Sequence, residues 1–503
     1  MYILRENTEL DGNSIRMQGE YPIAKNSFEL IYPDHLVFKT KSYNGLAEPI
    51  YAQDTMAKKS LLKLSLTDVA AVDSNEKYAN PNASLQLFRY KLDANLGKNL
   101  RNMYNYKEFA TNLYERFHQP LDKRDVKAIE QFCKDIPSAG SAEDVIWNIE
   151  NKLKKTVSYD RFVLGQNTLA EVLKSKQANQ RDLLRLYFAV FSQMKIDHNL
   201  VLTSNRYKIP FDRGFESYEN LNDLLFYFPA IKKFMTPTEI EYRVPLFPAE
   251  LAAQDGLFIK EKLFAGTTMG IGEISKVEVP GPEVTHDVME ISIDFTKDMS
   301  NPIVSSKILF GGYSAMNFQP IKDFIPDQQY QAMLKEIAKN YNVETEYKTL
   351  KASNEGTQFV GKKPFVLETT FEGKDLVRKA GDSYLVSIGQ LIGRQTEMYQ
   401  ENNRTLPVEI DHPHSYLRTI KVILPPGTGV RNLEKFTMDY SANVDGKSQA
   451  GFKSAYQQQS NEITVTNTEY YNVVNYPVTS FEAYRTVINA AADFNKIVLI
   501  LNK

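Results

Sequence analysis

The residues best placed for chemistry lie where a long apolar helix is predicted to begin. Asn179 is a favoured N-cap residue and Asp182 follows three residues later, in place to reach back to the cap, so the helix is predicted to start at Gln180. Apolar residues then cover nearly every face up to Met194, which indicates a helix buried on all sides. The N-terminus of such a helix favours a thiolate or an oxyanion. Gln180 supplies only an amide there, and an amide is no nucleophile at neutral pH.

The single cysteine is the only thiol that could supply a nucleophile elsewhere. Cys133 shares i, i+3, i+4, i+7 spacing with Ile129, Phe132 and Ile136, which is typical of a core-facing stripe. We expect a buried core thiol, with a reactive thiol as the alternative. One cysteine also excludes internal disulfides and cysteine-rich zinc sites.

Two histidines raise the question of a metal site. His412 and His414 would share one face of a strand, with Glu409 and Asp411 nearby. The alternative is an exposed strand edge that Pro413 interrupts. Because no third ligand follows at a suitable spacing, we expect no metal and no cofactor.

An aromatic segment, residues 216–229, could line a ligand groove. Tyr218, Asn222 and Tyr227 are the candidate lining residues. Packing of a buried strand explains the aromatic residues equally well, and we favour it for the tyrosines.

These residues are distributed over three compositional zones. Short alternating runs predict a β domain over residues 1–95. Helical stripes followed by strands predict an α+β domain over residues 96–265. Alternating runs return over residues 266–503 and predict a second β domain, mainly antiparallel from about residue 285, whose principal helices span 327–340 and 480–494.

Length and charge exclude several classes of partner. The 503 residues are enough for about three domains. Sixty Lys and Arg residues against 62 Asp and Glu leave a net charge of -2 without a basic block, so nucleic acid is not an expected partner. No apolar run reaches the ~18 residues of a membrane span, and the first residues lack the pattern of a signal peptide. The oligomeric state is left open.

The middle zone resembles a known family. Residues 169–204 are similar to the transglutaminase-like core, a papain-type fold in which Gly-Asp-Cys-Lys-Asp opens the buried helix; here residues 178–182 read Ala-Asn-Gln-Arg-Asp. Leu221-Asn222-Asp223 resembles the family's Phe-Asn-His strand, and Thr236-Pro237-Thr238 resembles its Asp-Pro-Thr turn. The resemblance therefore places Gln180, Asp223 and Thr236 at the family's cysteine, histidine and aspartate positions.

The flanking zones extend the resemblance to bacterial envelope proteins typical of Bacteroidetes, in which β domains of unknown function flank the core. This implies part of a β-sandwich, a papain-like core and a C-terminal β-sandwich, in a periplasmic or other cell-envelope protein. Met1 falls inside the N-terminal domain, so that domain is expected to be incomplete, with an open sheet edge or apolar surface, and any export signal is expected to precede it.

The resemblance implies a degenerate enzyme without thiol catalysis. Thr236 cannot orient an imidazolium as an acid can, and Asp223 has no thiol beside it to deprotonate. We expect a non-catalytic role in binding or scaffolding, with a peptide or a glycan as ligand. A hydrolase that uses a non-thiol site, through Asp223 or the His412 region, and a purely structural middle domain are the alternatives. Asp223 and Thr236 are expected on adjacent strands facing Gln180, within ~12 Å of it.

Overall fold

The computed structural model describes residues 4, 6–73, 75–264, 266–341, 346–399 and 403–502. The chain forms two compact units, one of Met1–Ile240 with Phe247–Glu278 and one of Glu241–Leu246 with Val279–Lys503. The first unit contains both the expected N-terminal β domain and the α+β zone. It also continues past the expected boundary at 265/266, because the strands on either side of that boundary pair in the same sheet.

The N-terminal part of the first unit is built from two three-stranded antiparallel sheets. Alternating residues of both sheets, such as Leu62 and Phe88, are buried in a shared core. The edge strand β4 is exposed along its whole length. The expectation that this domain is incomplete stays a prediction. The strands and the short helix that follows them are β1 (Asn13–Arg16), β2 (Ile23–Pro33), β3 (Leu36–Tyr43), β4 (Ile50–Asp54), β5 (Lys59–Val69), α1 (Pro81–Ser84) and β6 (Leu87–Asn95).

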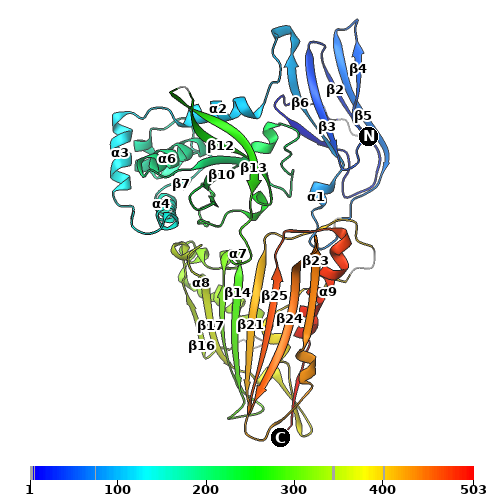
Figure 1. The fold of residues 1–503 in the computed structure, drawn as a ribbon, viewed down its shortest axis with the longest axis vertical. Helices are drawn as coiled ribbons and strands as arrows, with labels where there is room; N and C mark the ends of the chain where they lie inside the picture. The colour runs from blue at the N-terminus through cyan, green and yellow to red at the C-terminus, as the bar shows by residue number, and fades with distance from the viewer. Residues whose placement is uncertain are drawn as a thin grey trace. The chain divides into compact units, whose positions relative to one another are not determined.

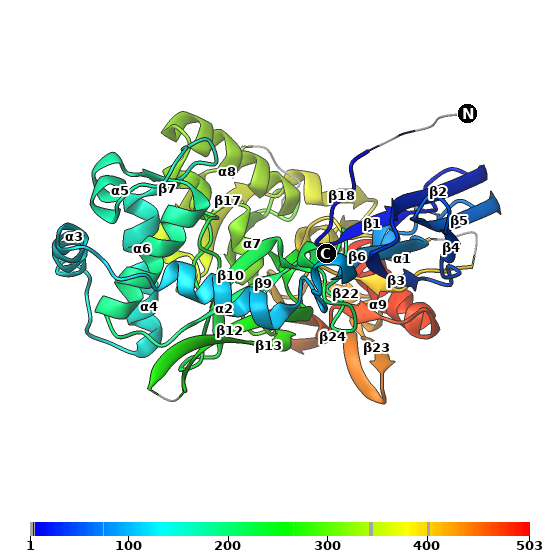
Figure 2. The ribbon, with the colours of Figure 1, turned by 90° about the horizontal axis from the view of Figure 1, so that it is seen from above.

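Helices followed by strands make up the rest of this unit, in the order that the sequence predicts. Each of the helices α2 to α6 begins after an Asn, Asp, Ser or Thr whose side chain accepts a backbone N–H of the first turn. Figures 1 and 2 show α3 to α6 gathered beside one antiparallel sheet of order β11-β10-β9-β12-β13. The bounds are α2 (Tyr106–Phe117), α3 (Lys123–Cys133), α4 (Ala142–Thr156), β7 (Ser158–Tyr159), α5 (Leu169–Ser175), β8 (Gln177–Ala178), α6 (Gln180–Gln193), β9 (Asn199–Thr203), β10 (Asp223–Phe228), β11 (Lys233–Met235), β12 (Gln254–Phe264) and β13 (Thr267–Val277).

The central helix α6 forms the core with β10. Its apolar side chains from Leu183 to Phe191 are buried on most faces, as predicted. The Phe191 ring lies 5.2 Å from that of Phe226 and 5.4 Å from that of Phe228. These edge-on aromatic contacts fix the helix against the alternate residues of the strand.

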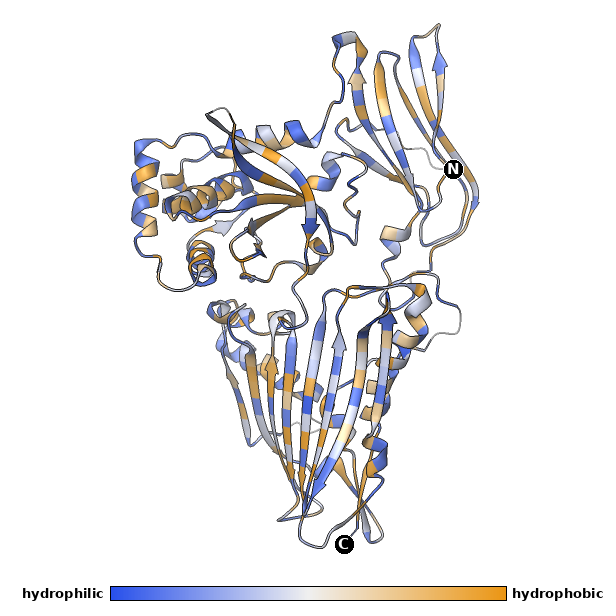
Figure 3. Ribbon diagram, in the orientation of Figure 1, coloured by the Kyte–Doolittle hydropathy of each residue, from blue (hydrophilic) through white to orange (hydrophobic). Residues whose placement is uncertain are grey.

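The second unit is dominated by an eight-stranded sheet of order β16-β17-β15-β14-β21-β25-β24-β23. Its neighbouring strands are antiparallel except for β14 and β21, which run parallel. Figure 3 shows the alternation of apolar and polar residues along these strands. The bounds are β14 (His286–Asp294), β15 (Ile303–Phe310), β16 (Thr349–Ser353), β17 (Phe365–Glu372), β21 (His414–Ile423), β23 (Met438–Val444), β24 (Lys447–Gln459) and β25 (Glu462–Tyr471).

The two helices expected in the second unit are confirmed as α8 (Asp327–Tyr341) and α9 (Phe481–Asn495), and both contribute buried apolar side chains to the core of this unit. The short helix α7 (Gly312–Met316) precedes them. The remaining strands form a four-stranded sheet and a two-stranded pair. Their bounds are β18 (Val377–Ala380), β19 (Ser383–Val386), β20 (Val408–Glu409), β22 (Gly429–Arg431), β26 (Asn475–Tyr476) and β27 (Leu499–Asn502). Among the described residues, no helix combines the length and the hydropathy needed to cross a membrane.

Asp287 on β14 should make the stability of this unit depend on pH. Burial raises the pKa of its carboxyl to about 6, although the Gly311 N–H donates a hydrogen bond to it. A carboxyl whose pKa is higher in the folded chain favours folding when it is protonated. The contribution of Asp287 to the free energy of unfolding should therefore fall as pH rises from about 4 through 6 and level off above. Urea unfolding at stepped pH should show this component in the wild type and not in Asp287→Asn; superimposable pH profiles would contradict it.

Candidate functional site

Gln180 occupies the start of α6, as predicted. The Asn179 side chain accepts the Asp182 N–H at 2.9 Å, which makes Gln180 the first helical residue. Its side chain is exposed. The free N–H groups of the first turn thus lie beside an exposed amide and not beside a nucleophile.

The Asp182 side chain does not reach back to the helix cap as expected, and it binds Asn167 instead. Its buried carboxylate accepts hydrogen bonds from the backbone N–H of Asn167, at 2.9 Å, and from the Asn167 side chain, at 3.1 Å. The Asn179 side chain meanwhile donates to the carbonyl oxygens of Val163 and Gly165. These bonds hold the loop before α5 against the start of α6. The loop therefore lies in a fixed position beside the helix N-terminus.

Asp223 begins β10, the strand that packs against α6. The Tyr187 and Phe191 rings of α6 lie against Phe226 and Phe228 of this strand.

The side chain of Asp223 nevertheless points away from the helix. It shares the face of β10 that carries Tyr227, whereas Phe226 and Phe228 face α6. Burial raises the pKa of its carboxyl, Lys208 lowers it and Glu250 raises it, so its charged neighbours come from the segments before β10 and before β12 and not from α6.

Thr236 is buried directly after β11. Within the part of the chain that the structure describes, no hydrogen bond or ion pair joins Gln180, Asp223 and Thr236 to one another. The expected separation of Asp223 and Thr236 from Gln180, within ~12 Å, stays a prediction, as does the orientation of Thr236.

The aromatic residues proposed to line a cleft are packed against other rings. Tyr218 contacts Phe109 at 4.6 Å between ring centroids, and Tyr227 contacts Phe234 at 4.9 Å. Asn222 is exposed and donates a hydrogen bond to the Glu219 carbonyl at 3.0 Å. Packing therefore accounts for both tyrosines, and of the three residues Asn222 is the one at the surface.

Cys133 is a core thiol, as predicted. It is buried at the end of α3, and burial raises the pKa of its thiol to about 11. A thiol with this pKa is almost entirely protonated at neutral pH, so it is a poor nucleophile.

The His412 region differs from the exposed strand edge that its sequence indicated. His414 opens β21, which lies between β14 and β25, so the expected exposed strand edge is wrong: the strand is central. The half-buried His414 ring donates through Nδ1 to the His412 carbonyl at 3.0 Å, and the His412 ring stacks on Tyr313. Nowhere in the described ranges is a group of three or more His, Cys, Asp or Glu side chains placed to hold a metal ion.

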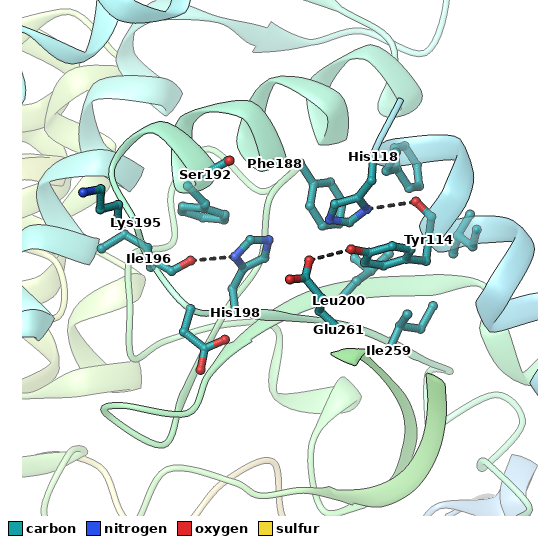
Figure 4. A pocket seen from close by; sticks show the side chains of 14 residues that line it. Tyr114, His118, Phe188, Ser192, Lys195, Ile196, His198, Leu200, Ile259 and Glu261 are labelled. Atoms are coloured by element: carbon teal, nitrogen blue, oxygen red, sulfur yellow. Dashed lines mark hydrogen bonds between the residues drawn. The ribbon is translucent and has the colours of Figure 1, made fainter. Parts of the chain in front are cut away.

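A pocket at the other end of α6 brings together residues that the sequence analysis did not single out. It has a volume of about 250 Å³ and is lined by residues of α2, α6, β9, β12 and the loop after α6. His118 donates from Nδ1 to the Tyr114 carbonyl at 2.9 Å, and His198 donates from Nδ1 to the Ile196 carbonyl at 2.8 Å. Burial lowers the pKa of both rings, so both are neutral at neutral pH. In Figure 4 their second nitrogens turn toward each other.

Glu261 supplies a carboxylate to the same pocket. The Tyr114 hydroxyl donates a hydrogen bond to its Oε2. Burial, together with this carboxylate, raises the pKa of Tyr114 above its usual value, so the hydroxyl keeps its proton. No sequence spacing links His118, His198 and Glu261; each has a chemically useful side chain, but only the fold places them together.

Comparison with known proteins shows a likeness of fold. No family model and no curated protein matches the chain. A solved structure described as a "putative protease" from Parabacteroides distasonis matches 99% of this chain and 76% of its own, with a TM-score of 0.56 and 10% sequence identity. The fold is shared with a Bacteroidetes protein. The likeness covers a multidomain α+β architecture with several sheets and leaves the catalytic status of this chain open.

Proposed function

We propose that this protein is a non-catalytic relative of transglutaminase-like, papain-type envelope proteins and that it binds a peptide or a glycan at the start of α6. The observation that carries the proposal is the exposed Gln180 amide at a helix N-terminus, where a thiol protease needs its cysteine. The fold likeness to the Parabacteroides distasonis protein supports descent from a hydrolase architecture. Cys133 offers no substitute, because it is buried and protonated.

The chemistry of this site suits the recognition of carbonyl groups. Apart from the Asp182 N–H, which the Asn179 side chain accepts, the N–H groups of the first turn and the Gln180 amide are hydrogen-bond donors, and the helix dipole favours a partial negative charge in front of them. Peptide carbonyls and the acetamido groups of glycans present such acceptors. The loop that Asp182 holds through Asn167 would border the ligand.

A second candidate function is hydrolysis through a non-thiol site, which the pocket of His118, His198 and Glu261 favours. Neutral imidazoles and a carboxylate are the groups that general-base catalysis uses. Turnover by the wild type that His198→Asn abolishes would establish this function in place of the first.

The first proposal predicts that the Gln180→Cys variant gains a reactive thiol but does not turn over peptide substrates. The new thiol should have a pKa below the ordinary ~8.5, because it lies at a helix N-terminus, and should react with iodoacetamide far faster than Cys133. Glutamine-containing and peptidoglycan-type peptides should nevertheless not be hydrolysed or transamidated, since Asp223 cannot act as the imidazole.

Wild-type protein serves as the control in both assays. Peptide mapping should find Cys133 unmodified in folded wild type, and the peptides should remain intact. Binding of the same peptides should weaken in Gln180→Ala, whereas undetectable binding to both proteins would favour a purely structural domain. Wild-type turnover that Gln180→Ala abolishes would overturn the proposal.

A further inference from the structure

We infer that the pocket at the C-terminal end of α6 binds a protonated primary amine. The groups that would recognise it are His118, His198, Glu261 and the aromatic ring of Phe188. This site lies at the opposite end of α6 from Gln180, so the inference does not rest on the proposed function.

The two histidines supply hydrogen-bond acceptors. Each Nδ1–H is used by a backbone carbonyl, which fixes the tautomer and leaves the Nε2 lone pair free. Neither Nε2 makes a hydrogen bond to any residue that the structure describes. The Phe188 ring contacts both imidazoles, at 4.9 Å from His118 and 5.2 Å from His198, so one wall holds both acceptors in place.

The charge of the pocket favours a cation. Two carboxylates, Glu261 and Asp197, and one ammonium group, Lys195, are among its lining residues, so its net charge is negative while the histidines are neutral. Tyr114 uses one oxygen of Glu261 and leaves the other for a ligand. An ammonium group has three N–H donors and no acceptor, which matches one carboxylate oxygen and two imidazole nitrogens.

The walls and the volume restrict the size of the ligand. Phe117 stacks on Phe188 at 5.3 Å, and aromatic faces attract organic cations. A volume of about 250 Å³ suits an alkylammonium group and not a drug-sized molecule.

Protons should compete with the ligand. The titratable groups around the pocket are His118, His198, Glu261, Asp197, Tyr114 and Lys195. Burial lowers the pKa of both histidines below 6.5, and the amine should exclude their protonation further. Affinity for the amine should therefore rise as pH increases through the histidine pKa values and level off near neutrality.

The test is a calorimetric titration of the full chain with n-butylamine, which is protonated at neutral pH, and with n-butanol as its neutral counterpart. Glu261→Gln should weaken butylammonium binding roughly tenfold or more, because a charge-assisted hydrogen bond is lost. Glu273→Gln is the matched control: it makes the same change at an exposed residue of the adjacent strand β13 and should leave binding unchanged. Wild-type affinity measured from pH 5 to 8 gives a second readout that needs no variant.

A lysine-containing tripeptide with blocked ends distinguishes the source of the amine. Binding of the tripeptide would assign the site to a peptide side chain, and its exclusion while butylammonium binds would assign it to a free small amine. Equal affinity for butanol, unchanged affinity in Glu261→Gln, or an affinity that falls as pH rises would each overturn the inference. Micromolar binding of Zn²⁺ alone that blocks butylammonium would also overturn it and identify a metal site instead. Gln180→Ala should leave amine binding intact, which separates this test from that of the proposed function.

Discussion

Replacement of Arg418 by methionine is expected to lower the free energy of unfolding of the second unit by about 3 to 5 kcal/mol. Arg418 on β21 is buried, and its guanidinium donates to the Glu469 carboxylate on the neighbouring strand β25 at 2.6 Å. The Tyr471 hydroxyl donates to the other oxygen of Glu469 at 2.8 Å. Loss of the guanidinium leaves a carboxylate in the sheet with one neutral hydrogen bond, so its desolvation is no longer offset.

A double variant separates the cost of the unpaired charge from the worth of the ion pair. Arg418→Met combined with Glu469→Gln removes both charges and should recover much of the lost stability, since buried ion pairs contribute little compared with neutral packing. Differential scanning calorimetry can follow the two units as separate transitions. A loss below about 1 kcal/mol in the single variant would mean that water reaches Glu469.

The second large effect is expected for Phe191→Ala, which should cost about 3 to 5 kcal/mol of the stability of the first unit. Phe191 is fully buried in α6 and contacts Phe226, Phe228 and His198. Truncation removes the apolar burial of the ring and leaves a cavity at the junction of helix and sheet. Since Phe191 also lines the pocket, its loss should loosen the position of His198.

Fluorescence of the only tryptophan gives the readout. Trp147 is buried in α4 of the same unit, so urea unfolding followed at this residue reports on the first unit. Phe162→Ala is the control with the same change in chemistry, because its ring is 73% exposed and its loss should change stability by no more than about 0.5 kcal/mol. Equal effects of the two substitutions would show that α6 does not hold the core together.

The proposed ligand site and the amine pocket lie at the two ends of one helix, and they differ in charge preference. The start of α6 presents donors to carbonyl oxygens, while the pocket beyond its end presents acceptors and negative charge to an ammonium group. A fold shared at 10% identity cannot assign either activity, because function depends on the side chains of the site. The variants at Gln180 and Glu261 therefore test the two sites separately.

The sequence by itself determined the elements whose signals are local. Asn179 predicted the start of α6 at Gln180, the apolar residues after it predicted the burial of this helix, and helical stripes predicted α8, α9 and the burial of Cys133. Capping and amphipathic periodicity depend on residues only a few positions apart, so they do not depend on the tertiary structure. The absence of a nucleophile at Gln180 is likewise a matter of residue identity alone.

Only the tertiary structure decided what depends on distant partners. The buried carboxylate of Asp182 binds Asn167 and not the helix cap, and β21 became a central strand because β14 and β25 pair with it on its two sides. His118, His198 and Glu261 have no mutual spacing that a sequence pattern could reveal. They meet because α2, the loop after α6 and β12 pack around the same aromatic core, and packing between segments far apart in the chain is set by the fold as a whole and not by any local signal.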